Sequence, residues 1–343
     1  MRPLWLRAGS TGALHSFVTP AMRFLLVLLS LCSALAADYD WLIRNARVVD
    51  GTGNPWYRAD VGVRAGRIAA IGKLDSATAT HVVDAAGRVL APGFIDIHTH
   101  IEDTIEKVPG ADNFVMDGVT TVVTGNCGGS WLNLGEAFAR LEKMGIGINV
   151  ASLIGHNTVR RQVMGTANRA PTAQELARMQ ELVEQGMRDG AVGLSTGLIY
   201  IPGAYASTEE IIALAKVAAR HGGIYASHIR DEGARAIEAI EEAVRVGREA
   251  NIPVEIAHFK IDNRRLWGAS TRTLALVEKS RREGVDVTVD QYPYDRSSTG
   301  ITILLPEWAL ADGEARIKER LADPPTRSRI AREMERRLKN LGH

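Results

Sequence analysis

Cysteine is almost absent from this 343-residue sequence, which contains only Cys32 and Cys127. If Cys32 is removed with an N-terminal signal, the mature protein keeps one thiol and can form no internal disulfide. The presence of Cys127 then needs another explanation, such as a functional role. A surplus of one charge is also missing, because 41 Lys and Arg residues stand against 40 Asp and Glu residues. This balance gives no electrostatic reason to expect nucleic acid or an anionic surface as a partner.

A long apolar run is missing as well. No segment approaches the roughly 20 apolar residues that span a bilayer, so we expect no stable membrane span in the mature protein. A short basic segment, the apolar run 24–31 and an Ala-x-Ala motif ending at Ala36 follow the order of a secretory signal peptide. We predict that residues 1–36 are removed by cleavage between Ala36 and Ala37, with Met22 as an alternative start. The mature protein is then secreted or periplasmic.

The pattern of apolar segments changes at Pro92. Between residues 38 and 91, short strand-like segments alternate with turn signals such as 50–55 and 65–66. This pattern predicts a small all-β domain, a β-sandwich, over residues 38–91. After Pro92, apolar strands instead alternate with stretches that have the 3.6-residue apolar spacing of helices.

This alternation of strand and helix predicts an α/β fold with a parallel sheet. The predicted strands cover residues 93–98, 120–125, 147–154, 191–198, 223–227, 254–257 and 285–289. The predicted helices include residues 173–188, 208–221, 234–250 and 271–283. Seven readable strands indicate a (β/α)₈ TIM-like barrel over residues 92–343 that is incomplete by one unit.

Metal-binding residue types follow four of these strands. His98 and His100 end the first strand and point the same way, because strand side chains alternate. Cys127 follows the second strand among glycines, and His228 and His258 follow the fifth and sixth. A bare His-x-His or a lone cysteine is usually structural, but active sites of (β/α)₈ barrels form where the strands end. Thiolate and imidazole are zinc ligands, so the shared location predicts a metal centre.

The remaining histidines lack this placement and are interpreted as surface or structural residues. They are His15, His81, His156, His221 and His343. Of these, His156 follows the third predicted strand and could line the pocket.

The segments that contain the candidate ligands resemble the N-acyl-D-amino-acid deacylase (D-aminoacylase) family of the amidohydrolase superfamily. The similar strings are residues 92–100, 118–128 and 193–200, and the resemblance extends from about Asp38 to about Gly300. A His-x-His motif alone marks only the superfamily. The Gly-Asn-Cys-Gly string within 118–128 is more specific, because most relatives hold their metals with a carboxylated lysine instead.

The resemblance implies hydrolysis of the amide bond of N-acyl-D-amino acids by attack of a metal-bound hydroxide on the acyl carbonyl. It implies one zinc ion held tightly by Cys127, His228 and His258. A second, weaker zinc site would involve His98 and His100, with Cys127 able to bridge. Zinc lowers the pKa of bound water towards about 7 and polarises a carbonyl, which suits this chemistry.

The resemblance also assigns groups to the substrate. Tyr200 would lie near the scissile carbonyl as a catalytic residue, and Lys260, Tyr292 and Ser298 would bind the substrate carboxylate. Lys260 lies two residues past His258, so strand alternation could place its cation on the metal-facing side. Tyr292 could equally pack at the rim.

Two departures from the family pattern leave alternatives open. Ile101 stands where the family often has an acid, and the catalytic aspartate expected from strand eight is not found before His343, so the chain reads as truncated. One alternative is a catalytically dead zinc-binding fragment; if the chain is active, Glu102 or Asp103 would be the first candidate base. Another is an isoaspartyl dipeptidase or cyclic-amide hydrolase, disfavoured because residues 191–200 contain no lysine.

Overall fold

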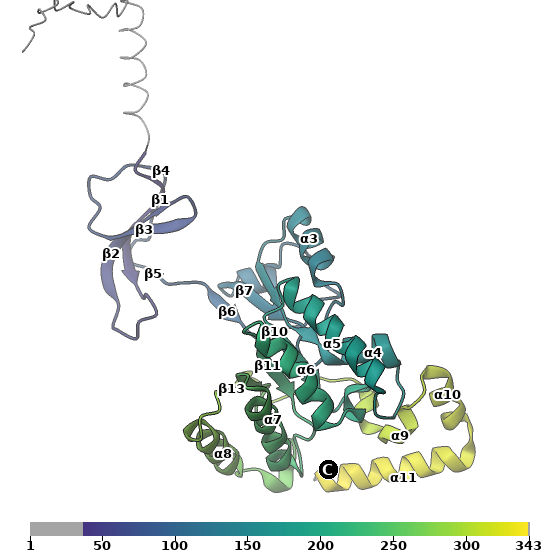
Figure 1. Cartoon of the computed structure of the whole chain (residues 1–343). Helices are drawn as coiled ribbons and strands as arrows, with labels where there is room; N and C mark the ends of the chain where they lie inside the picture. Colours follow the sequence, from purple (N-terminus) through teal and green to yellow (C-terminus); the bar gives the residue numbers. More distant parts are fainter. Residues whose placement is uncertain (1–36, 342–343) are drawn as a thin grey trace, which may run out of the picture. The chain divides into compact units, whose positions relative to one another are not determined.

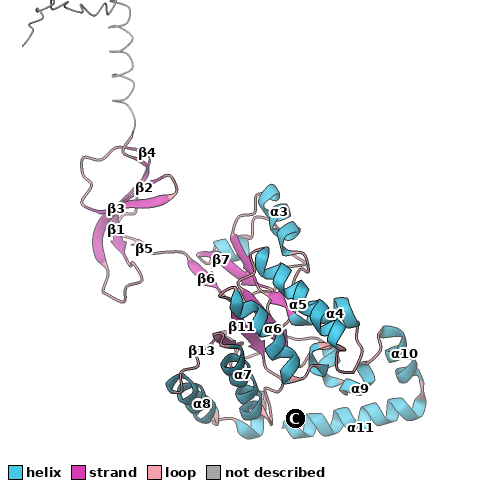
Figure 2. Cartoon of the chain, in the orientation of Figure 1, coloured by secondary structure: helices cyan, strands magenta, loops and turns pink. Residues whose placement is uncertain are grey.

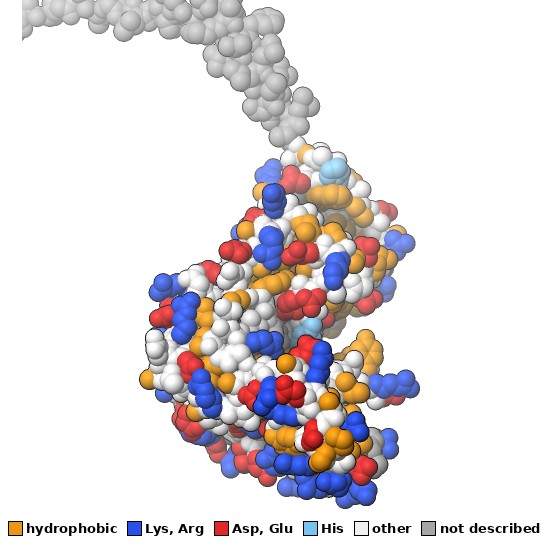
Figure 3. Space-filling model, turned by 90° about the vertical axis from the view of Figure 1, so that its right-hand side faces the viewer, with side chains coloured by type: hydrophobic (Ala, Val, Ile, Leu, Met, Phe, Trp, Pro, Cys, Tyr) orange, Lys and Arg blue, Asp and Glu red, His pale blue; other side chains and the backbone are white. Residues whose placement is uncertain are grey.

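The computed structural model describes residues 37–341, so the predicted signal segment 1–36 lies outside the described residues. The chain divides into two compact units between Pro92 and Gly93 (Figure 1). Among the described helices, none has the length and apolarity needed to cross a membrane. On the face seen in Figure 3, acidic and basic side chains are intermixed, as the balanced composition leads one to expect.

The N-terminal unit is built on one five-stranded sheet. Its strands are β1 (Tyr39–Val48), β2 (Tyr57–Arg64), β3 (Arg67–Gly72), β4 (Ala79–Asp84) and β5 (Val89–Leu90). The first strand is central, because it pairs antiparallel with β2 and parallel with β4 and β5. Leu42 and Ala46, both on this strand, are fully buried. The described part of this unit contains a single sheet, so the second layer of a sandwich stays a prediction.

The second unit contains the parallel strands. They are β6 (Phe94–Asp96), β7 (Val119–Thr124), β8 (Asn149–Ser152), β9 (Ile154–Gly155), β10 (Gly193–Gly197), β11 (Ile224–His228), β12 (Val254–Ile256) and β13 (Val287–Val289). Each pairs in parallel with its neighbour in the orders β6-β7-β8 and β9-β10-β11-β12-β13. The predicted α/β fold with parallel strands is therefore confirmed. Residues 290–341 contain helices and loops but no strand.

The strand predicted over 147–154 is interrupted at Leu153, which separates β8 from β9. Hydrogen bonds continue across this break. The Leu153 N–H donates to the Thr124 carbonyl at 2.9 Å, and the Val192 N–H donates to the Ser152 carbonyl at 2.9 Å. The two short sheets are thus joined through one bent strand, and the carboxyl ends of their strands share one rim.

Helices flank the strands of the second unit. They are α2 (Asp112–Val115), α3 (Leu134–Met144), α4 (His156–Met164), α5 (Ala173–Arg188), α6 (Thr208–Arg220), α7 (Ala236–Ala250), α8 (Ser270–Arg282), α9 (Glu307–Leu310), α10 (Glu314–Ala322) and α11 (Pro324–Leu341), with short 3₁₀ turns at Gly203–Tyr205, Arg264–Leu266 and Ile301–Leu304. The helices α5, α6, α7 and α8 pack in sequence along the outside of the sheet (Figure 2).

Local sequence explains where these helices begin. Thr172 and Glu175 form a reciprocal capping box at the start of α5, and the Ser207 hydroxyl accepts from the third residue of α6. The apolar face of each helix then packs on the strands. Leu194 and Tyr225 are fully buried in this core, and each such side chain stabilises the fold by about 1.5–3 kcal/mol.

Candidate metal centre

Four of the five predicted ligands meet at the carboxyl ends of the strands. The imidazole nitrogens His98 Nε2, His228 Nδ1 and His258 Nε2 lie 3.5, 3.5 and 3.7 Å from the Cys127 sulfur. His228 ends β11, whereas Cys127 and His258 lie in the turns just beyond β7 and β12. Residues separated by up to 160 positions are brought together only because parallel strands end at one rim.

These separations match the geometry of a tetrahedral zinc ion. Zinc binds sulfur at about 2.3 Å and imidazole nitrogen at about 2.0–2.1 Å, which puts the sulfur and each nitrogen roughly 3.6 Å apart. The donor set is also chemically suitable, because one soft thiolate and several imidazoles favour zinc over calcium or magnesium. The residues present therefore fit the ion that the sequence predicts.

The backbone of two ligands is held in an unusual conformation. Cys127 and His258 have φ angles of 52° and 38°, in the left-handed region that side-chain-bearing residues rarely adopt. Such a conformation costs about 1–3 kcal/mol and persists only when neighbouring groups enforce it. The Gly128 N–H donates to the Ser195 hydroxyl at 3.1 Å, and the His258 N–H donates to the Asp290 carboxylate. These bonds fix the direction in which both ligands point.

Burial and neighbouring charged groups shift the pKa values of the residues at the site. Burial raises the pKa of the Cys127 thiol to about 12, and the Glu232 and Asp290 carboxylates act in the same direction. Burial also lowers the pKa of His228 to about 3. For Glu232, burial alone would raise the pKa, but the hydrogen bond with His258 and the neighbouring His228 and Lys260 groups outweigh it and lower the pKa to about 2.

Two carboxylates of the centre were missed in the sequence. Asp290 Oδ2 lies 2.7 Å from His98 Nδ1, and Glu232 Oε1 lies 2.7 Å from His258 Nδ1. A signal for the first was present, because Asp290 directly follows β13 as His228 ends β11. No strand periodicity marks Glu232, which lies in a loop four residues after His228.

His100 is placed differently from the other predicted ligands. Its ring lies edge-on to the His98 ring at a centroid distance of 5.4 Å, and the residue is exposed. Two groups of closely spaced donor atoms occur among the described residues, one of His98, Cys127 and His258, the other of His228, Glu232 and His258. Neither includes His100, although it borders the same cavity as His98.

The predicted substrate-binding residues divide into two groups. The Lys260 ammonium lies 2.6 Å from Glu232 Oε1 and 5.7 Å from the Tyr292 ring centroid. The Tyr200 ring stands edge-on to the His228 ring at 4.9 Å. Ser298, by contrast, is exposed on the loop after β13. Lys260, Tyr200 and Tyr292 therefore border the metal centre, while Ser298 points into solvent.

The other polar residues named in the sequence have structural partners. Glu102 Oε1 accepts from the Thr124 hydroxyl and the Gly125 N–H, both at 2.6 Å, whereas Asp103 is exposed. His156 is fully buried, with Nε2 2.8 Å from the Glu210 carboxylate. Glu102 thus supports the turn that carries Cys127, and His156 lies in the core rather than in the pocket.

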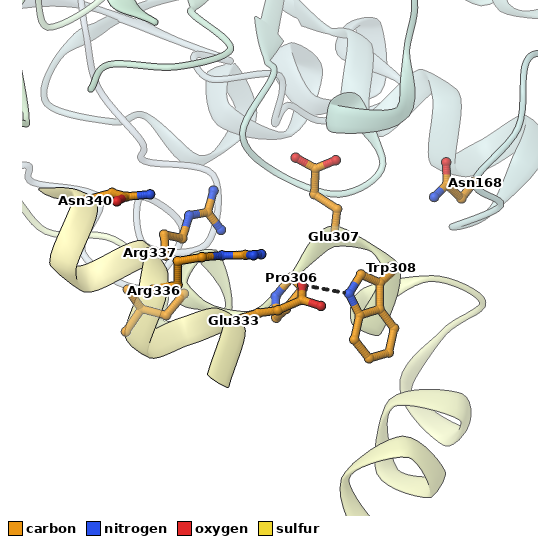
Figure 4. Close-up of a pocket in the computed structure, with 9 residues that line it drawn as sticks. Asn168, Pro306, Glu307, Trp308, Glu333, Arg336, Arg337 and Asn340 are labelled. Atoms are coloured by element: carbon orange, nitrogen blue, oxygen red, sulfur yellow. Dashed lines mark hydrogen bonds between the residues drawn. The ribbon is translucent and has the colours of Figure 1, made fainter. Parts of the chain in front are cut away.

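Two cavities open beside the centre, and a third lies away from it. One of about 460 Å³ is lined by His98, His100 and a mixture of polar and apolar side chains from the residues around them. Another of about 260 Å³ is lined by Tyr200 and mainly apolar side chains. A third, of about 500 Å³, lies between α11 and α9 and is bordered by Trp308 and by Glu333, which accepts from the indole N–H (Figure 4). None of the predicted site residues lines the third cavity.

Comparison with known proteins gives one consistent result. The amidohydrolase family matches residues 81–298. The D-aminoacylase of Alcaligenes xylosoxydans xylosoxydans is 42% identical over 284 residues, covering 76% of this chain and 58% of the relative. A D-aminoacylase crystal structure superposes with a TM-score of 0.72 at 40% identity, covering 75% of this chain and 59% of that one.

An N-acyl-D-glutamate deacylase from Bordetella bronchiseptica, solved with zinc and a phosphonate inhibitor that mimics the tetrahedral intermediate, superposes equally well. Its TM-score is 0.72 at 39% identity, covering 75% of this chain and 59% of that chain. The chain thus spans about three-fifths of the length of the relatives it matches.

Proposed function

The chain belongs to the amidohydrolase family, and we propose that it hydrolyses the amide bond of N-acyl-D-amino acids with the help of zinc. The observation that carries the proposal is that three imidazole nitrogens each lie 3.5–3.7 Å from the Cys127 sulfur. The D-aminoacylase and the zinc-containing N-acyl-D-glutamate deacylase to which the chain is similar support the substrate class.

Cys127, His228 and His258 would hold the tightly bound zinc ion, and His98 and His100 would contribute to a second, weaker site. When bound, zinc polarises a carbonyl and lowers the pKa of water towards about 7. The equal distance of His98 Nε2 and His228 Nδ1 from the sulfur, 3.5 Å each, agrees with a thiolate able to serve both sites.

The organic part of the substrate would be held by three neighbouring groups. The Tyr200 hydroxyl, now 3.1 Å from the Thr299 hydroxyl, would donate to the acyl oxygen as negative charge develops there. Lys260 would bind the α-carboxylate, because it is the cation beside the metal ligands. Tyr292 and Ser298 would close over the carboxylate from the loop after β13.

The strands that carry this chemistry would form most of a (β/α)₈ barrel. Their parallel order supports this, as does the contact of 2.7 Å between His98, after the first strand, and Asp290, after the last. For the N-terminal unit, Val82 and Val83 are both exposed on β4 and point to opposite faces of the sheet, so the second layer of a sandwich would cover one of them.

A direct test measures zinc content and hydrolysis by the purified full chain against N-acetyl-D-amino acids, their L-enantiomers and their amides. We expect about one tightly bound zinc ion and turnover of the D-acids. Zinc binding without turnover of any N-acyl amino acid would contradict the proposed activity but leave the metal site standing. Turnover that survives complete zinc removal would contradict the metal's role.

Lys260→Ala sharpens the test of substrate recognition. We expect KM for N-acetyl-D-amino acids to rise about 10- to 100-fold, the size of a lost charged hydrogen bond, with little change for the uncharged amides. The control is Lys279→Ala, which removes an exposed lysine on α8 that pairs with Glu283. Equal losses on acids and amides would show that Lys260 does not recognise the carboxylate.

A further inference from the structure

Glu232 lies behind two of the metal ligands. Its side chain is only 12% exposed, Oε1 is 2.7 Å from His258 Nδ1, and Oε2 is 3.9 Å from His228 Nε2. These two nitrogens are on the far sides of their rings, because His258 Nε2 and His228 Nδ1 are the atoms that face the Cys127 sulfur. One carboxylate therefore faces the outer nitrogens of both rings.

The tautomer of each imidazole follows from this arrangement. A neutral imidazole binds a metal through the nitrogen that carries no hydrogen, so the other nitrogen must be an N–H donor. Zinc at the sulfur cluster thus requires Nδ1–H on His258 and Nε2–H on His228. Among the described residues, His228 Nε2 is buried without a hydrogen-bond partner. Glu232 Oε2 is the acceptor beside it, and a small side-chain shift would close the gap.

Lys260 brings a third hydrogen-bond donor to the same carboxylate. Its ammonium lies 2.6 Å from Glu232 Oε1 and 3.1 Å from His258 Nδ1. If His258 Nδ1 carries a hydrogen, the ammonium and the ring face each other as two donors, and only the shared carboxylate accepts from both. Without Glu232, the ammonium would still donate to the His258 carbonyl at 3.3 Å, but the two donors would share no acceptor.

We propose that Glu232 is a positioning residue that fixes the tautomers of His228 and His258 and anchors Lys260 beside them. The proposal rests on the proposed zinc centre and deepens it: the carboxylate presents the lone pairs of both imidazoles to the metal. A group of this kind typically changes metal affinity by 10- to 100-fold.

The first experiment compares Glu232→Gln with Glu242→Gln in the full chain. Glu242 is a suitable control, because its side chain is 14% exposed and also forms a short ion pair, 2.8 Å from Arg230, but it touches no candidate ligand. Zinc affinity is measured by competition with a chelator, and folding is checked by thermal unfolding. We expect a 10- to 100-fold loss of affinity for Glu232→Gln, and less than about threefold for Glu242→Gln. Equal losses would overturn the proposal.

The second experiment needs no metal and no variant. In the metal-free full chain under mildly alkaline conditions, nitrogen NMR of the imidazole rings reports which nitrogen carries the hydrogen. We expect Nδ1–H for His258 and Nε2–H for His228, both becoming mixtures in Glu232→Gln and neither changing in Glu242→Gln. Mixed tautomers in the unsubstituted chain would overturn the proposal. Fixed tautomers in a chain that binds no zinc would support Glu232 while contradicting the proposed function.

Discussion

The carboxyl ends of the strands and the loop of residues 291–300 would carry the two halves of the site, and they are built very differently. His228, at the end of β11, is 4% exposed, whereas Tyr294 in the loop is 75% exposed. Cys127 and His258 adopt strained backbone angles that neighbouring hydrogen bonds enforce. The loop, apart from Tyr292, is exposed.

This difference in burial shows that the fold itself organises the metal-binding half of the site but not the loop half. In the metal-binding half, the strand ends place three imidazole nitrogens 3.5–3.7 Å from the Cys127 sulfur, close to the separation in a tetrahedral zinc site. Such preorganisation means that binding costs little reorganisation. The loop half has few buried contacts, so any part it plays in binding must come with the substrate. Substitutions in the two regions should therefore affect different measurements.

The largest effect is expected from Cys127→Ala. The thiolate is the softest ligand and lies within 3.7 Å of all three imidazole nitrogens, so its loss should lower zinc affinity by more than about 100-fold, beyond the range for supporting residues. Chelator competition and elemental analysis measure this. If metal content and affinity were unchanged, Cys127 would be only a packing residue, and the comparison between the two regions would lose its basis.

The next largest effect is expected on the pH dependence of zinc affinity, which concerns only the metal half of the site. The pKa of the Cys127 thiol is raised to about 12 by burial, so zinc must displace its proton. The pKa of His228 is about 3, and that ring has no proton to lose at neutral pH. Above about pH 8, where ordinary imidazoles are neutral, the thiol proton alone should make zinc affinity rise at least about tenfold per pH unit until the thiol pKa is reached.

Isothermal calorimetry in buffers of different ionisation enthalpy can count the proton that the thiol releases. Water bound to zinc also loses a proton in this pH range, so we expect the unsubstituted chain to release about one proton more per zinc ion than Cys127→Ala does. A flat pH profile in the unsubstituted chain would mean that the thiolate already exists without metal, contrary to the effect of burial.

Gly128→Ala tests how tightly the metal half is packed. Gly128 has φ +77°, and an added Cβ would lie 2.1 Å from Asn157 Oδ1. Gly145, at the end of α3, has φ +72°, but a Cβ added there would meet no atom within 4 Å, so Gly145→Ala carries the backbone strain alone. Both should lose about 1–2 kcal/mol from the left-handed backbone, and Gly128→Ala a further 1–3 kcal/mol or so from overpacking.

Urea unfolding of both variants supplies the comparison. Zinc affinity should also fall in Gly128→Ala but not in Gly145→Ala, because only the first displaces the turn that carries Cys127. Equal unfolding free energies of the two variants would show that the turn around Gly128 can move to accommodate the added methyl group. The metal half would then be less rigid than its hydrogen bonds suggest.

The sequence predicted most of what depends on strand periodicity. The parallel strands were placed because long apolar runs are recognisable, and His98, Cys127, His228 and His258 followed because ligands collect where such strands end. The break at Leu153 was not predicted, since nothing in an apolar run marks a bend.

What the sequence missed depends on side chains meeting in space. Glu232 lies in a loop with no periodicity, and its partners His258 and Lys260 are 26 and 28 residues away, so only the fold reveals the contact. Asp290 directly follows a strand and could have been named by the rule that found His228. His100 shows the converse: alternation placed it beside His98, but its ring lies outside both groups of close donors.

The smallest effect is expected from Ser298→Ala, the counterpart in the loop half to Cys127→Ala. Ser298 is exposed, so removing its hydroxyl should change the free energy of unfolding by less than about 0.5 kcal/mol and leave zinc affinity unchanged. If the loop closes over the substrate, one hydrogen bond to the carboxylate is lost, worth about 0.5–1.5 kcal/mol or roughly 2- to 10-fold in affinity for an N-acetyl-D-amino acid. Calorimetric titration of the zinc-loaded chain measures this, with the uncharged amide as the control ligand.

An unchanged affinity for the acid would remove Ser298 from the substrate site, whereas a fall in zinc affinity would mean that the loop belongs to the metal half and that the two regions are not independent.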